Sequence, residues 1–156
     1  MVTRTKIRIS DDIGLRKILD EEYERSSQVK LCKYALSLTT HILTMIDYGD
    51  MNNSILTEGY AINESWQKGN ARMHDVRQAG LQIHRLAKNS QNHVTQTALR
   101  VAGQAVAAGH MPEHAMVASD YAIKVINLLF PDDINAVKQE RLWQIEQLKS
   151  MEDTIA

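Results

Sequence analysis

The chain has few cysteines, prolines and aromatic residues, and each shortage excludes a class of protein. Its 156 residues include one cysteine, two prolines and a single phenylalanine. The lone Cys32 excludes an internal disulfide framework and suits a reducing compartment. Aromatic residues make up only 5% of the chain, which is little for a β-sandwich or a β-barrel. These shortages favour an all-helical protein of the cytoplasm.

A strong net charge and long apolar runs are also missing. The formal net charge is −1, so no overall field draws the chain to nucleic acid or to a membrane surface. No run approaches the roughly 18 apolar residues of a membrane-spanning helix. The first ten residues lack the apolar stretch of a signal peptide. We therefore expect neither a nucleic-acid partner nor a membrane partner.

The stretch from 98 to 129 is the clearest pattern present. Its first half is rich in alanine and glycine, and such small side chains let two helix axes approach closely. Gly109 is expected to end one helix in the left-handed conformation, and Pro112 to open the next. Apolar residues then recur at helical spacing, which predicts two helices packed back to back. The residues expected at their contact are Ala102, Ala105, Ala118 and Ala122.

Helical periodicity extends over most of the remaining chain. A short helix is expected after an N-cap at Ser10, followed by helices at about 28–48, 54–66, 71–88 and 133–148. Short loops between helices of similar length indicate one all-α domain of about six or seven antiparallel helices, either a closed bundle or a short α-solenoid-like stack. We assign residues 1–25 to an N-terminal extension with a short helix, and residues 26–150 to the main helical domain.

Histidines are the residues that come nearest to a chemical motif. His110 and His114 have the i, i+4 spacing of a helical metal site, but Pro112 disfavours one continuous helix through both. No further ligands at metal-binding spacing support them, so we predict no metal and no cofactor. His84, at the edge of an apolar stripe, is expected to be a hydrogen-bonded core residue. The alternative is a small hydrolase or metal enzyme that uses the three histidines with Asp120, which could partner a histidine.

Several motifs together resemble a family of immunity proteins. The segment 98–110, with Arg100 and Gly103, is similar to that family's Ala/Arg-rich helix, which runs into a His-x-x-x-His turn ending here at His114. Tyr121 and Lys124 resemble its Tyr-Ala-x-Lys element. Glu-Arg-Leu-Trp-Gln at 140–144 is similar to its Glu-Arg-x-Trp-Gln element, and contains Arg141 and Trp143. The upstream motif residues are Trp66 and His84.

Over residues 26–148 the chain is thus similar to the all-helical, five-like immunity-protein family of bacterial polymorphic toxin systems. It departs from the family pattern at Gly80, Gln82 and Leu86, where the family is rich in alanine, and the first 25 residues do not align. The resemblance implies a non-enzymatic cytoplasmic protein that neutralises a cognate protein toxin by binding it. A structural homo-oligomer is a third alternative, and a homodimer is compatible with a binding protein.

The resemblance also divides the candidate residues into two groups. The matched motif residues have the types that build a fold, and we expect them to be structural rather than catalytic. The partner would then be bound by exposed polar residues on the acidic outer face of the first helix or in the loop near residue 50. The residues predicted for partner binding are Asp20, Glu21, Glu22, Glu24, Asp50 and Asn53.

Overall fold

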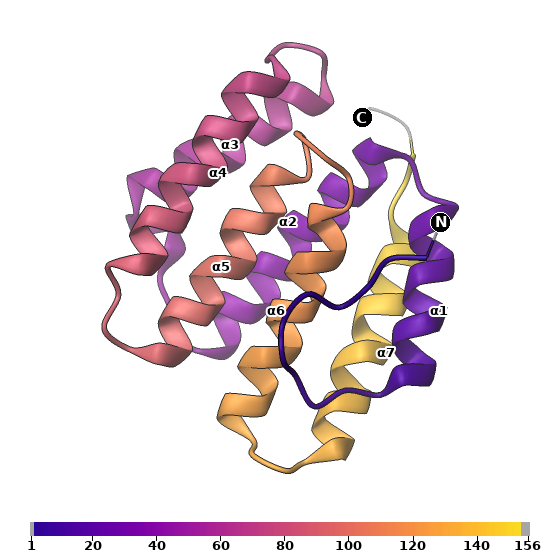
Figure 1. Cartoon of the computed structure of the whole chain (residues 1–156). Helices are drawn as coiled ribbons and strands as arrows, with labels where there is room; N and C mark the ends of the chain where they lie inside the picture. Colours follow the sequence, from indigo (N-terminus) through magenta and orange to yellow (C-terminus); the bar gives the residue numbers. More distant parts are fainter. Residues whose placement is uncertain (1, 154–156) are drawn as a thin grey trace.

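The computed structural model describes residues 2–153, and within that range the chain forms seven α-helices and no strand. The predicted all-α fold is thereby confirmed. Consecutive helices run back and forth and are joined by short loops (Figure 1). A 3-10 turn, Asp50–Asn52, precedes the third helix. The helices are α1 (Ile13–Glu24), α2 (Gln28–Met45), α3 (Ser54–Gln67), α4 (Met73–Lys88), α5 (His93–Ala107), α6 (His114–Leu129) and α7 (Ile134–Ser150).

Helix α5 lies in the middle of the molecule. It is flanked by α4 and α6, and α2 packs across both α5 and α6 (Figure 1). Helix α3 lies outside α4 at one edge, whereas α1 and α7 pair at the opposite edge. The main core includes fully buried Leu38, Ile83 and Val101 from α2, α4 and α5. No helix of the described residues is long and apolar enough to cross a bilayer.

The close contact predicted between α5 and α6 is present. Ala102, Ala105, Ala118 and Ala122 are all 0% exposed. The expectation for Gly109 is wrong, because α5 ends at Ala107 and Gly69 is the only described glycine with a positive φ. Gly109 is instead needed for space, since a Cβ there would lie 2.8 Å from a methyl group of Val76. Pro112 lies two residues before α6, and its carbonyl accepts the Ala115 amide.

Most helices begin with a polar side chain that accepts an otherwise unpaired backbone amide. The side chain of Asp12 caps α1 in this way, and Asn53 caps α3. The predicted cap at Ser10 is therefore wrong. Ser10 instead donates its amide to the side chain of Asn127 on α6 and accepts from the same side chain. These two hydrogen bonds attach the segment before α1 to α6.

We call residues 2–12 the N-terminal strap, because they cross the outside of α6 before entering α1 (Figure 1). Ile9 packs against the small apolar cluster of Ile123, Ile126 and Val137. Lys124 donates to the backbone carbonyl of the strap residue Arg8. The strap therefore lies against α6, to which these contacts attach it.

Candidate functional site

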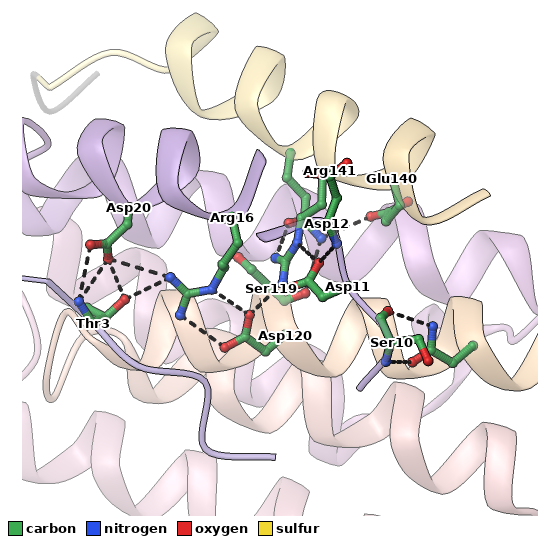
Figure 2. Close-up of polar contacts among 12 residues, drawn as sticks. Thr3, Ser10, Asp11, Asp12, Arg16, Asp20, Ser119, Asp120, Glu140 and Arg141 are labelled. Atoms are coloured by element: carbon green, nitrogen blue, oxygen red, sulfur yellow. Dashed lines mark hydrogen bonds and ion pairs between the residues drawn. The ribbon is translucent and has the colours of Figure 1, made fainter. Parts of the chain in front are cut away.

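A buried ion network lies where α1, α6 and α7 meet, and its centre is Asp120 on α6. The Asp120 side chain is 2% exposed. Arg16 of α1 binds it with two nitrogens, at 2.9 and 3.2 Å, while Arg141 of α7 donates to it at 2.8 Å (Figure 2). Arg141 also donates two hydrogen bonds to the carboxylate of Asp11 in the strap. One carboxylate thus joins three helices, and charged partners compensate each buried charge.

The network extends along α1 to Asp20. Asp20 is 4% exposed, faces Arg16 at 3.6 Å, and accepts hydrogen bonds from the amide and hydroxyl of Thr3 (Figure 2). The prediction that Asp20 belongs to an exposed acidic face is therefore wrong. Asp20 follows Arg16 by one helical turn, so both lie on the face of α1 that turns inward. Glu21 and Glu24 are exposed, whereas Glu22 is partly buried and pairs with Arg25.

In the Glu-Arg-Leu-Trp-Gln motif of α7, the three polar residues are buried, Trp143 is partly buried and Leu142 is exposed. Glu140, 4% exposed, lies 2.7 Å from the Nε2 atom of His41 on α2. The ring of Trp143 stacks on the ring of His41 with centroids 3.7 Å apart. Gln144 donates to Glu140 and accepts from Arg141. These contacts fix α7 against α2 and α6, and they give His41 a partner that the sequence did not indicate.

A second polar cluster joins α4, α5 and α6 around Gln104. The Oε1 atom of Gln104 lies 2.6 Å from Nδ1 of His114, and its Nε2 atom lies 3.5 Å from Nε2 of His84. An amide oxygen only accepts and an amide nitrogen only donates. With the Gln104 amide in this orientation, a neutral His114 donates through Nδ1 and a neutral His84 accepts at Nε2, which leaves the His84 proton on its other nitrogen, Nδ1. This Nδ1 atom is the only buried side-chain nitrogen or oxygen among the described residues without a hydrogen-bond partner.

The environment of this cluster keeps its histidines neutral. Burial, aided by the charges of Arg100 and His114, lowers the pKa of His84 to about 4. Burial also lowers the pKa of His114, with smaller contributions from His110 and Lys6. The His84 ring lies directly on Gly103, where a Cβ would come within 2.6 Å of it. The motif residues His84 and Gly103 are thus parts of one contact between α4 and α5.

The constellation of the hydrolase alternative does not assemble. Both carboxylate oxygens of Asp120 are held by arginines, and no histidine of the described residues forms a hydrogen bond or an ion pair with it. The rings of His110 and His114 have centroids 6.0 Å apart. Within residues 2–153 no three histidine, cysteine, aspartate or glutamate side chains are placed to share a metal ion.

Of the remaining candidate residues, Trp66 and Tyr121 lie partly buried against the core, and Asp50 and Asn53 lie in the turn before α3. Asp50 accepts a hydrogen bond from the hydroxyl of Tyr60, and Asn53 caps α3. The loop near residue 50 therefore uses two of its polar side chains to hold its own conformation.

These contacts define an all-helical domain whose buried polar side chains bind its helices to one another. The chain belongs to the family described as "Imm-5 like putative immunity protein", whose model matches residues 21–151. No match was found among curated proteins or among solved structures. The family match begins inside α1, so the strap and Arg16 lie outside it. Residues beyond the family match therefore complete the ion network around Asp120.

Proposed function

We propose that this protein is a non-enzymatic, cytoplasmic immunity protein that neutralises a cognate protein toxin by binding it. The observation that carries the proposal is the family match, which spans most of the chain. Membership in this family gives the class of protein. We propose in addition that the protein binds a toxin. The proposed mechanism needs no metal and no cofactor, because neutralisation by binding requires only a complementary surface.

The geometry of the motif residues supports a binding role. His84, Gly103 and His114 contact one another or share Gln104, while Arg141 and Trp143 fix α7. We propose that the family motif builds the scaffold and that partner recognition falls to exposed side chains. Exposed side chains adapt to a new partner without disturbing a core, which suits a protein that must match one toxin among many.

The test is a toxicity rescue combined with a direct binding measurement. The product of the neighbouring gene would be expressed with and without this protein, and the purified pair would be analysed by size-exclusion chromatography. We expect growth to be restored and the two chains to elute as one stoichiometric complex. Rescue without a complex, accompanied by chemical change in the toxin, would contradict a binding mechanism and favour an enzyme.

A further inference from the structure

A groove of about 620 Å³ runs along the outer side of the α3–α4 pair. The α3 residues that line it follow helical spacing, so the groove lies parallel to the helix axes. The lining from Ile55 to Ser65 extends for about 15 Å, which matches roughly three turns of a helix. The groove is lined in part by Ile55, Glu58, Ile62, Asp75, Gln78 and Gln82.

The floor of the groove is apolar and its rim is polar and acidic. Ile55 and Ile62 supply apolar surface, and Ile55 is 37% exposed. No lysine, arginine or histidine lines the groove. Of its two carboxylates, Asp75 pairs with the exposed Arg72. The carboxylate of Glu58 has no hydrogen-bond or ion-pair partner among residues 2–153.

The rim also offers two unused amides. Gln78 and Gln82 lie one turn apart on α4, and their side chains have no hydrogen-bond partner within the described chain. An apolar floor beside one unpaired carboxylate and two amides is complementary to a helix that carries an apolar stripe with a lysine or arginine beside it. A neutral or acidic helix would leave Glu58 without a counter-charge at the contact.

We propose that the α3–α4 groove binds a basic amphipathic helix of the cognate toxin. The inference rests on the proposed function and assigns it a surface different from the acids predicted on α1. Apolar residues of the toxin helix lie over Ile55 and Ile62, and one of its cationic side chains meets Glu58. Association is therefore steered by charge and held by apolar contact.

Two matched pairs of variants test the groove in the full-length chain, with the product of the neighbouring gene as the binding partner. Ile55→Ser is compared with Leu81→Ser, because both side chains are 37% exposed and only Ile55 lines the groove. Glu58→Lys is compared with Glu64→Lys, an exposed acid on the same helix outside the groove. We expect each groove variant to raise Kd about tenfold or more and each control to change it less than about twofold.

Two further measurements identify the chemistry of the contact. Raising the ionic strength should slow association of the wild-type pair, and Glu58→Lys should reduce that salt dependence. Hydrogen exchange on the unmodified chain should show protection of α3 and α4 in the complex, which requires no variant to fold. A photo-crosslinker at Gln78 should capture a toxin peptide that contains lysine or arginine beside an apolar stripe.

The outcomes separate this inference from the proposed function. If the wild-type pair binds but the groove and control variants behave alike, the groove is the wrong surface and the immunity role stands. If Glu21→Lys on α1 weakens binding instead, the toxin docks on the acids predicted from the sequence. If the isolated protein forms dimers that Ile55→Ser dissociates, a second copy occupies the groove and the inference is overturned. If no complex forms with the wild-type chain, both proposals fail.

Discussion

The two edges of the molecule are built in opposite ways. At the α1–α7 edge, buried arginines and carboxylates from distant parts of the chain are paired, and the N-terminal strap covers α6. At the α3–α4 edge, glycines allow close approach: a Cβ at Gly59 would lie 2.8 Å from Ile83, and one at Gly80 would lie 3.3 Å from Ala107. Buried charge pairs distinguish the first edge, and close approach at glycines distinguishes the second.

The difference bears on where recognition is possible. At the α1–α7 edge the polar groups of the network already have partners, so a ligand would have to displace them. At the α3–α4 edge Glu58 and two glutamines keep their hydrogen-bonding capacity beside apolar surface. A protein that must be stable and also bind a partner gains from this separation, because changes in the binding surface leave the ion network intact.

The largest expected effect comes from removing the centre of the ion network. Asp120→Ala leaves Arg16 and Arg141 buried next to each other without their shared carboxylate. We expect the free energy of unfolding to fall by about 3–5 kcal/mol, measured by chemical denaturation. The control is Glu64→Ala, which removes an exposed acid of α3 and should leave the denaturation midpoint almost unchanged. Equal midpoints for the two variants would show that the network is not what fixes the α1–α7 edge.

The next effect concerns packing in the middle of the molecule. Ala105 is 0% exposed in the region where α5 meets its neighbours. Ala105→Leu forces three additional carbon atoms into a filled space and should cost about 1–3 kcal/mol of stability. Ala61→Leu, at an exposed position of α3, provides the control. An unchanged denaturation midpoint for Ala105→Leu would mean that the contact has room to expand.

The sequence predicted the fold well because the patterns that indicate helices involve residues close together along the chain. Helical spacing of apolar residues and the small residues from 98 to 129 depend only on neighbours along the chain, and they located the helices and the buried alanines. The same local reasoning placed the end of α5 at Gly109, where the structure shows that glycine is required by Val76 of another helix. A glycine needed for space and a glycine needed for a turn look alike in a sequence.

The ion network and the groove were not predictable, because they depend on contacts between distant residues. Arg16 and Asp120 are 104 positions apart, and His41 and Glu140 are 99 apart. Asp20 was interpreted as part of a solvated acidic run, since nothing in the run distinguishes it from Glu21. Only the packing of α1 shows that one acid turns inward and its neighbour does not. The groove likewise arises from two helix faces that are separately unremarkable in sequence.

The pH dependence of stability reports on the histidine cluster at the α4–α5 contact. His84 has an ordinary pKa near 6.5 when unfolded and about 4 when folded, so between these values only the unfolded chain takes up the proton. The free energy of unfolding should therefore fall as the pH drops from about 6.5 to 4, by on the order of 2 kcal/mol. His84→Gln should flatten this slope, whereas His74→Gln, at an exposed position of α4, serves as control. Identical slopes for both variants would assign the effect to other groups.

The last comparison sets two neighbouring acids of α1 against each other. Asp20→Ala removes the acceptor of Thr3 and a partner of Arg16, and should cost about 1–3 kcal/mol. Glu21→Ala removes an exposed side chain and should change stability by less than about 0.5 kcal/mol. Thermal unfolding of the two variants at equal concentration measures the difference. If Glu21→Ala destabilised as much as Asp20→Ala, the buried contact of Asp20 would not explain the loss of stability, and the contrast between the two edges would lose its basis.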